Sequence, residues 1–328
     1  MACKVKKIAI WGLGKHATKN IIPAINEVEG LKLAGICSRS KNVVKDLADK
    51  LNCFGWTDPV DMLNKKDLDI VYLSTPIGLH AEQGKNVLLA GKHLWSEKPF
   101  TCDLLQSEEL VNLSRNKNLT VAEGFMYRYH KQFKEICNKI NTNQLGRIKE
   151  VNFKFGFPEL ESPGFRYDPS LCGGALWDVG CYSISAAVHL FKNESVDVKF
   201  VDLKFCESNR VDCDGTVVLE FSGGARVIST WHYGVGYKNE IDVWGENGSL
   251  YSDKIFSKVN NYIPELRIRD KFGVETVNKL VSMNQFVEMF NRFLHLIVSE
   301  NHSEQERKDI IQRAKLMNEI ANYNLSKV

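Results

Sequence analysis

The chain of 328 residues has no long apolar run, no block of like charge and no paired cysteine motif. No apolar stretch approaches the roughly 20 residues that a transmembrane helix requires. The first residues lead directly into a strand-like segment at 7–11, which leaves no room for a signal peptide. These absences predict a cytoplasmic protein that does not associate with a membrane.

Charge of one sign is also scarce. The sequence has 43 basic and 40 acidic residues, and its net charge is +3. Lys4, Lys6 and Lys7 form a small basic cluster, but this cluster only flanks a strand-like segment. Nucleic acids and anionic lipids bind larger basic patches than this one. We therefore expect no nucleic-acid partner.

Cysteine motifs that hold metals or disulfides are absent too. The nine cysteines are scattered, and no C-x-x-C occurs. An odd number of cysteines without a pairing pattern predicts reduced thiols, with neither disulfides nor a zinc site. Cys37 and Cys206 lie in apolar strand-like runs and are expected to be core residues. No metal is expected to take part in the function.

What is present is a regular alternation of strand and helix patterns in residues 1–123. This alternation predicts an α/β domain with a parallel sheet and helices on both faces, of the kind that binds dinucleotides. The strand patterns lie at 7–11, 31–37, 69–74, 93–96 and 120–123, and the helical patterns at 15–26, 42–51, 79–90 and 104–116.

The pattern changes in residues 124–328, where strands dominate. These residues predict an α+β domain on a large, mainly antiparallel sheet, whose helix-free face a partner subunit would cover. The closing helices could pack back on the first domain, and Ser303–Glu306 resembles a capping box for the last one. Strand patterns lie at 147–156, 196–206, 216–221, 225–233 and 240–244, and helical patterns at 129–141, 176–191, 284–299 and 303–325.

A G-x-G-x-x-A turn follows the first strand directly. Gly12 suits the tight turn, Gly14 lets backbone approach a pyrophosphate, and Ala17 lets the helix pack close to the strand. The helix start offers N–H groups to phosphates, and we expect Lys15 and His16 in the same turn to line the cofactor. The alternative is a glycine turn in an ordinary α/β protein.

The residues after the second strand select the cofactor. NAD-binding proteins place a carboxylate there for the ribose 2′-OH, whereas this chain has Ser38 and Arg39. A guanidinium suits a 2′-phosphate. The sequence therefore predicts a preference for NADP(H), with NAD(H) possible. The alternative is that Arg39 is a solvated loop charge.

Two further segments follow strands, at the edge where an α/β sheet binds its ligand. Thr75–Pro76 is predicted to line the cofactor, and His80 is either catalytic or a supporting residue behind the site. Glu97–Pro99 follows the next strand. Within it, Lys98 can hydrogen-bond the nicotinamide ribose and lower the pKa of a neighbouring acid–base group.

A glycine pair leads into the helical pattern of the second half. Gly173 and Gly174 allow close approach of backbone or ligand, and Asp178 and Tyr182 follow at a spacing of four, which places them on one helical face. Taken alone, this pattern fits an ordinary helix start equally well.

Together these motifs resemble the glucose–fructose oxidoreductase / inositol dehydrogenase (Gfo/Idh/MocA-type) family. The resemblance rests on G-x-G-x-x-A, T-P-x-x-x-H-A-E, E-K-P, E-G-F-M-Y-R at 123–128 and G-G-A-x-x-D-x-G-x-Y, in this order over nearly the whole chain. It implies a Rossmann domain followed by an α+β domain. The open sheet of the second domain would carry the substrate and form a homodimer or homotetramer.

One branch of the family fits better than the others. Many relatives have histidine where this chain has Tyr182, and the tyrosine form resembles dihydrodiol dehydrogenases, aldose dehydrogenases and nucleotide-sugar 3-ketoreductases. Arg166 lies in a segment similar to that branch, and either contacts cofactor or substrate or forms a structural ion pair. Cys172 and Ile77 depart from the common pattern, which has glycine and asparagine at these places.

The resemblance implies hydride transfer between nicotinamide and a sugar carbon. Tyr182 would be the acid–base group, Lys98 would assist it, and Asp178 would orient substrate or tyrosine. Arg128, Trp177 and Tyr237 are the predicted substrate contacts. Trp231, His232 and Tyr233 are further aromatic candidates for the sugar pocket, and each is equally a candidate for the core.

The leading functional hypothesis is NADPH-dependent reduction of a 3-keto sugar linked to a nucleotide diphosphate. Oxidation of a free aldose or of a trans-dihydrodiol is the enzymatic alternative. A non-catalytic, NAD(P)-binding regulator is the alternative of another class, and the presence of Lys98, Asp178 and Tyr182 argues against it.

Overall fold

The computed structural model describes residues 5–206 and 210–323. The chain divides into two compact units, Met1–Gly124 with Phe286–Ala314, and Phe125–Gln285 with Lys315–Val328. Residues 286–314 therefore belong with the first unit, an arrangement that the sequence prediction left open.

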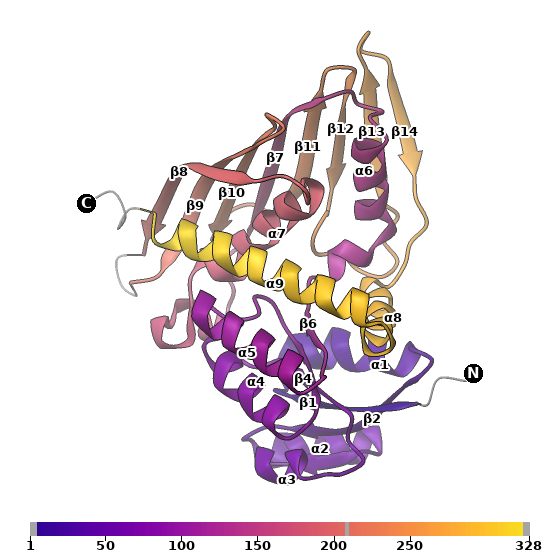
Figure 1. Cartoon of the computed structure of the whole chain (residues 1–328), viewed down its shortest axis with the longest axis vertical. Helices are drawn as coiled ribbons and strands as arrows, with labels where there is room; N and C mark the ends of the chain where they lie inside the picture. The colour runs from indigo at the N-terminus through magenta and orange to yellow at the C-terminus, as the bar shows by residue number, and fades with distance from the viewer. Residues whose placement is uncertain (1–4, 207–209, 324–328) are drawn as a thin grey trace. The chain divides into compact units, whose positions relative to one another are not determined.

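The first unit contains a parallel sheet, as predicted. Its six strands lie in the order β3-β2-β1-β4-β5-β6 (Figure 1). The order reverses between β1 and β4, so right-handed crossovers place helices on both faces. The strands are β1 (Lys6–Trp11), β2 (Leu31–Cys37), β3 (Phe54–Trp56), β4 (Ile70–Leu73), β5 (His93–Ser96) and β6 (Val121–Glu123), and the helices are α1 (Ile22–Glu27), α2 (Lys41–Leu51), α3 (Pro59–Leu63), α4 (His80–Leu89) and α5 (Leu104–Asn116).

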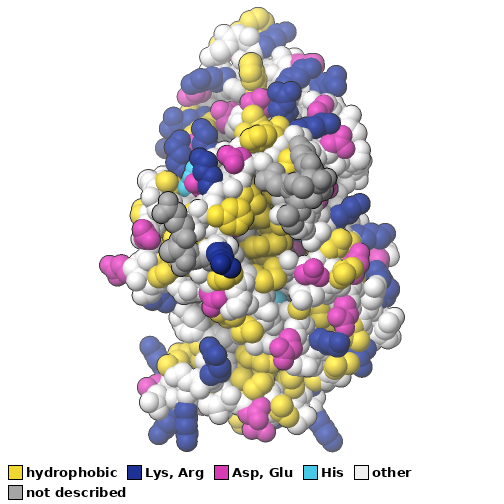
Figure 2. Space-filling model, turned by 90° about the vertical axis from the view of Figure 1, so that its left-hand side faces the viewer, with side chains coloured by type: hydrophobic (Ala, Val, Ile, Leu, Met, Phe, Trp, Pro, Cys, Tyr) yellow, Lys and Arg dark blue, Asp and Glu magenta, His cyan; other side chains and the backbone are white. Residues whose placement is uncertain are grey.

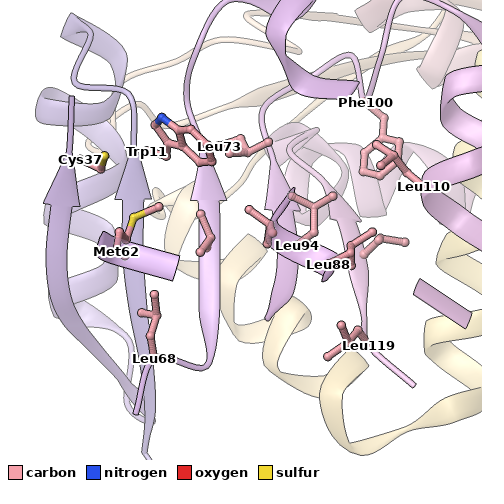
Figure 3. Close-up of a cluster of buried hydrophobic side chains, with 14 of the residues drawn as sticks. Trp11, Cys37, Met62, Leu68, Leu73, Leu88, Leu94, Phe100, Leu110 and Leu119 are labelled. Atoms are coloured by element: carbon pink, nitrogen blue, oxygen red, sulfur yellow. The ribbon is translucent and has the colours of Figure 1, made fainter. Parts of the chain in front are cut away.

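A continuous apolar core covers one face of this sheet (Figure 3). The Trp11 ring lies beside Leu73, and Leu94 lies beside Leu88 of α4, in a cluster that also includes Leu110 of α5. Each of these leucines is at most 2% exposed, and burial of one such side chain contributes about 1.5–3 kcal/mol. The core fixes the strand ends from which the candidate site is built.

The second unit contains the large open sheet. Its eight strands lie in the order β14-β13-β12-β11-β7-β10-β9-β8, and all neighbours are antiparallel except β7 and β10. Helices α6 and α7 cover one face (Figure 1). The elements are α6 (Lys131–Asn141), β7 (Ile148–Phe157), α7 (Cys181–Leu190), β8 (Val196–Phe205), β9 (Asp212–Phe221), β10 (Arg226–Tyr233), β11 (Lys238–Gly245), β12 (Gly248–Asp253), β13 (Glu265–Asp270) and β14 (Glu275–Lys279).

The start of the last helix differs from the prediction. The last helices among the described residues are α8 (Gln285–Val298) and α9 (Glu300–Ala321), so Ser303 lies inside α9 and does not cap it. Its N–H donates to the Ser299 carbonyl at 2.9 Å, which is an intrahelical bond, and Ser303 is fully buried. The capping-box prediction was therefore wrong, because the helix begins three residues earlier.

The expectation that the thiols are all reduced was also wrong. Cys206 and Cys213 form a disulfide, with a Cα–Cα distance of 5.6 Å. Cys206 directly follows β8, and Cys213 lies on β9 at a register shift, between the partners of Lys204 and Phe205, so the antiparallel pairing of the two strands brings the two cysteines close, which their spacing in the sequence does not reveal. Cys37 is a core residue as predicted, at 1% exposure, whereas Cys206 is half-buried.

One segment among the described residues is longer and more apolar than the sequence analysis allowed. Pro169–Leu190 reaches a mean hydropathy of 1.2 over 18 residues, which is sufficient by length and composition to cross a membrane. However, 83% of that stretch is buried inside the protein. Such burial is what a core helix shows.

Charged side chains of both signs are mixed on the face drawn in Figure 2. Lysine and arginine side chains alternate there with aspartate and glutamate side chains and with apolar patches. A nucleic-acid-binding face would instead concentrate basic side chains.

Candidate functional site

Glycine is needed at the two positions of the first turn, Gly12 and Gly14, for different structural reasons. Gly12 has φ +106°, and an added Cβ would lie 2.5 Å from the Ser74 carbonyl oxygen, so only glycine fits. A Cβ at Gly14 would meet no protein atom within 4 Å. Packing within the protein therefore does not require Gly14, whereas close approach of a phosphate to the backbone does.

The helix after this turn is not a regular α-helix. Its first turn closes with the Thr18 N–H on the Gly14 carbonyl, and a π-helical segment, Ala17–Ile21, precedes α1. Pro23 lies in the first turn of α1, where its missing N–H is tolerated. The predicted helix at 15–26 is thus interrupted. Its first N–H groups have no partner within the helix and suit a phosphate.

A half-buried carboxylate, that of Glu97, anchors the turn to the end of β5. The His16 Nε2 lies 2.9 Å from Glu97, and the Tyr72 hydroxyl donates to the same carboxylate at 2.6 Å. The Asn20 amide lies 3.1 Å from His16 Nδ1, and donation to that atom leaves the proton on Nε2. Burial raises the pKa of Glu97, but His16, Tyr72 and the Lys98 charge outweigh it and lower the pKa to about 2.

His80 has a supporting position behind the strand ends. It is 1% exposed, its Nε2 lies 2.9 Å from the Thr75 carbonyl and its Nδ1 lies 3.0 Å from the Pro99 carbonyl. Burial lowers its pKa, against the effect of these carbonyls. The ring therefore holds the segments after β4 and β5 together. The Thr75 hydroxyl donates to Gln83 at 2.6 Å, which fixes that residue further.

Glu123 is a positioning residue that the sequence analysis quoted only as part of a motif. One of its carboxylate oxygens accepts the Phe100 N–H at 2.8 Å, and the other accepts from Arg313 at 2.7 Å. Arg313 also contacts Glu306, and all three side chains of this ion network are at most 6% exposed. Glu123 thus holds the residues that follow Lys98 and Pro99. The local sequence gives no indication of this role of Glu123, because its partner Arg313 is 190 residues away.

Arg39 lies where the sequence placed it, in the loop between β2 and α2. The neighbouring Ser38 N–H donates to the Trp56 carbonyl at 3.1 Å, which fixes the loop backbone. The Arg39 side chain is exposed, and it forms no ion pair with any residue in 5–206 or 210–323. Its charge remains available for an anionic ligand.

In the second unit, Asp178 is held by two side chains. The Arg166 Nε donates to Asp178 at 2.6 Å, and the Tyr233 hydroxyl lies 3.3 Å from the same oxygen. Burial lowers the pKa of Arg166, but the Asp178 charge outweighs it and the pKa rises. Burial and the Asp178 charge together raise the pKa of Tyr233. The structural ion pair, one of the two roles considered for Arg166, is therefore present.

The glycine pair before this helix, Gly173 and Gly174, is approached closely by other atoms of the protein. A Cβ at Gly173 would lie 2.6 Å from the carbonyl oxygens of Phe165 and Arg166, and one at Gly174 would overlap the Asp212 carboxylate. Asp212 accepts the Leu176 N–H at 2.6 Å, at the start of the π-helical segment Leu176–Gly180. Burial raises the pKa of Asp212 to about 6.

Tyr182 is enclosed by aromatic rings and is 8% exposed. The Tyr127 hydroxyl donates to the Tyr182 carbonyl at 3.3 Å, and the Tyr182 hydroxyl lies 4.0 Å from the Met126 sulfur. The hydrogen bond from Tyr127 holds the Tyr182 backbone, and packing against neighbouring aromatic rings holds the Tyr182 side chain. Asp178 lies in the π-helical segment, whose wider turn changes the single helical face expected for the pair. The rings around Tyr182 are Phe125, Tyr127, Phe155 and Phe256, at centroid distances of 5.4–6.1 Å.

The remaining candidates have different surroundings. Trp231 is fully buried, and a Cβ at Gly180 or Gly215 would overlap its ring, so it is a core residue. Arg128 is 7% exposed, and its guanidinium lies 5.7 Å from the Tyr129 ring. Tyr233 is buried, Trp177 and His232 are half-buried, and Tyr237 is exposed with its hydroxyl 3.4 Å from the Ser257 carbonyl.

Two family models match this chain. One, described as "Oxidoreductase family, NAD-binding Rossmann fold", matches residues 6–125. The other, described as "GFO/IDH/MocA C-terminal domain", matches residues 133–251. The chain belongs to the Gfo/Idh/MocA oxidoreductase family. The family and the fold predicted from the motifs are thus confirmed.

Several curated Gfo/Idh/MocA proteins are similar over most of the chain. The dTDP-3,4-didehydro-2,6-dideoxy-alpha-D-glucose 3-reductase of Saccharopolyspora spinosa is 28% identical, over 84% of this chain and 82% of its own. The reductase of the same name from Actinomadura kijaniata is 27% identical, over 96% and 94%. D-xylose 1-dehydrogenase (NADP(+)) 2 of Haloferax volcanii is 32% identical, over 66% of each chain.

Solved structures agree with this assignment to the Gfo/Idh/MocA family. A 3-ketoreductase from Actinomadura kijaniata, in complex with NADP and TDP-benzene, superposes with a TM-score of 0.91. It is 25% identical, and the match covers 97% of both chains. Forms of that protein with one tyrosine or one lysine replaced are also among the solved structures.

Proposed function

We propose that this enzyme reduces a keto group of a nucleotide-linked sugar with NADPH. The observation that carries the proposal is near-full-length similarity to dTDP-sugar 3-reductases, together with the TM-score of 0.91 to a 3-ketoreductase solved with NADP and TDP-benzene. The substrate class is therefore a 3-keto sugar attached to a nucleoside diphosphate.

The choice of NADPH over NADH rests on residues of this chain. Gly14 leaves the backbone open to a pyrophosphate, and Arg39 offers an exposed guanidinium after β2 that forms no ion pair within the described part of the chain. A guanidinium binds the 2′-phosphate of NADP in two hydrogen bonds and has no equivalent partner in NAD. The two features together fit NADP(H).

Three side chains would carry the chemistry. Bound NADPH would supply the hydride for the carbonyl carbon, and Tyr182 would donate a proton to the developing alkoxide. Lys98 stabilises the charge that remains on the phenol, and Asp178 orients the sugar hydroxyls. The packing of the Tyr182 ring among aromatic side chains and the hydrogen bond from Arg166 to Asp178 support these roles, because a proton donor must be held in position.

The test is NADPH oxidation in the presence of a panel of dTDP-linked 3-keto sugars. Wild-type enzyme should turn over at least one of them, and Tyr182→Phe should lose about 10²–10⁴-fold in kcat. Tyr251→Phe is the matched control, because its hydroxyl bonds Glu240 on β11, away from these groups, and its kcat should stay unchanged. A loss below tenfold in Tyr182→Phe would remove Tyr182 from the acid–base role.

A second activity has its own supporting observation. The Haloferax volcanii D-xylose dehydrogenase is more identical to this chain, at 32%, although over a shorter span. Oxidation of a free aldose with NADP⁺ is therefore the alternative function. Reduction of NADP⁺ by D-xylose, without turnover of any nucleotide-linked sugar, would favour it.

We also propose that the large sheet mediates homo-oligomerisation. Register places Phe200 opposite Val218, and Val218 opposite Ile228, on the face that α6 and α7 leave uncovered. Trp244 of β11 lies on the same face and is 64% exposed. A row of apolar side chains on an open sheet is typical of a subunit interface.

A further inference from the structure

A pocket lies at the amino ends of the parallel strands, whereas the glycine turn lies at their carboxyl ends. It has a volume of about 330 Å³. Figure 3 shows Leu68 at the amino ends of the strands, whereas Cys37 and Leu73 lie at the carboxyl ends. The lining residues are Lys7, Lys32, Leu33, Ala34, Asn52, Cys53, Phe54, Trp56, Lys65, Asp67 and Leu68, which we call the amino-end pocket.

One wall of the amino-end pocket is aromatic. Phe54 and Trp56 stack with ring centroids 5.7 Å apart and an interplanar angle of 25°. Gly35 makes this possible, because a Cβ there would overlap the Trp56 ring. Phe54 is 62% exposed, so its ring remains open to a ligand. A flat apolar group could pack on this wall.

The rim of the pocket has excess positive charge. Lys7 pairs with Asp67 at 2.5 Å, so these two charges cancel. The Lys65 ammonium lies 5.3 Å from the Phe54 ring centroid, and neither Lys65 nor Lys32 pairs with an acidic side chain in 5–206 or 210–323. Two uncompensated ammonium groups thus border an aromatic wall.

We propose that the amino-end pocket binds a small amphipathic anion, an aromatic ring that carries one acidic group. The ring packs on the exposed Phe54, whose ring stacks on the largely buried Trp56, and the acidic group contacts Lys65 and Lys32. The volume lies within the range of about 300–1,000 Å³ of small-molecule sites. The nicotinamide cofactor would bind at the carboxyl ends of the strands, so this ligand and the cofactor can be bound together.

Calorimetric titration of 2-naphthoate into the full chain, saturated with NADP⁺, tests this site. We expect one bound naphthoate per chain, weakened about fivefold or more in Lys65→Ala and in Phe54→Ala, because each removes one of the two recognition elements. Lys45→Ala, an exposed lysine on α2 outside the pocket, should bind as the wild type does. Thermal unfolding of each variant shows that it is folded.

The neutral probe 2-naphthylmethanol separates charge recognition from ring packing. It should bind about fivefold or more weakly than 2-naphthoate, and the difference should shrink at 1 M salt, where ion pairs are screened. Equal affinity for both probes would overturn the proposal. Displacement of 2-naphthoate by NADP⁺, or binding that survives both Lys65→Ala and Phe54→Ala, would overturn it as well.

Discussion

At the scale of single residues, cofactor choice depends on one exposed guanidinium. Arg39 has no ion-pair partner among the described residues, so its charge can be reversed without loss of an internal contact. Arg39→Asp should reverse the preference, since a carboxylate repels a 2′-phosphate and accepts a ribose hydroxyl. We expect the ratio of kcat/KM for NADPH to that for NADH to fall at least tenfold. Lys45→Asp on α2 is the control, and an unchanged ratio in Arg39→Asp would exclude the assignment.

Glu97 gives a prediction for stability against pH. Its pKa in the folded protein is about 2, below the ordinary 4.5. A lowered pKa contributes stability above pH 4.5, and this contribution is lost as the pH falls from 4.5 toward 2. Urea unfolding should therefore show that Glu97→Gln destabilises the protein more at pH 6 than at pH 3. Glu109→Gln, at an exposed ion pair with Lys85, should show little change, and equal destabilisation by Glu97→Gln at both pH values would contradict the prediction.

The local sequence predicted the positions of residues whose place is set by the backbone, at the ends of strands. The positions of Gly12 and Thr75, just after the ends of β1 and β4, could be predicted because strand ends are visible as apolar runs. Glu123 and Asp212 could not be, because their partners are 190 and 36 residues away and only the fold brings them together. The ion pair of Arg166 with Asp178, 12 residues apart, remained one of two alternatives for the same reason.

At the scale of elements, α9 is joined to the parallel sheet by a buried ion network. Arg313 lies between Glu123 and Glu306, and its side chain is 5% exposed. Arg313→Ala would leave two buried carboxylates without their cation, which costs about 3–5 kcal/mol of unfolding free energy. Arg115→Ala removes an exposed pair with Glu304 and should cost about 0–1 kcal/mol. Denaturant titration measures the unfolding free energy of both variants. A loss of unfolding free energy in Arg313→Ala as small as that in Arg115→Ala would contradict a stabilising role of the ion network.

The predicted boundaries of helices and strands were wrong where the local sequence patterns gave conflicting indications. The periodicity at 15–26 predicts one helix, but a π-helical segment and Pro23 divide it. The Ser303–Glu306 pattern is that of a capping box, yet α9 already includes it, because the preceding residues are also helical. The short strand β3 and the hairpin strands β12 to β14 were not predicted, and β14 is exposed along its whole length, which leaves no alternation of apolar and polar residues.

At the scale of the whole molecule, the open sheet predicts an assembly. Trp244 is 64% exposed on the uncovered face, and burial of such a side chain between subunits stabilises an oligomer. Trp244→Lys should shift sedimentation velocity toward the monomer at micromolar concentration. Phe272→Lys, at the turn between β13 and β14 and 80% exposed, is the control. A wild-type protein that sediments as a monomer would refute the interface.

Gly14 offers a way to separate ligand affinity from folding. Because a methyl group there touches nothing in the protein, Gly14→Ala should keep the wild-type melting temperature while it hinders the dinucleotide. Gly12→Ala, which collides with Ser74, should unfold at lower temperature. Gly14→Ala would then be a folded protein that can bind the sugar substrate but binds the dinucleotide poorly. With it, the order in which the two reactants associate could be measured without any turnover.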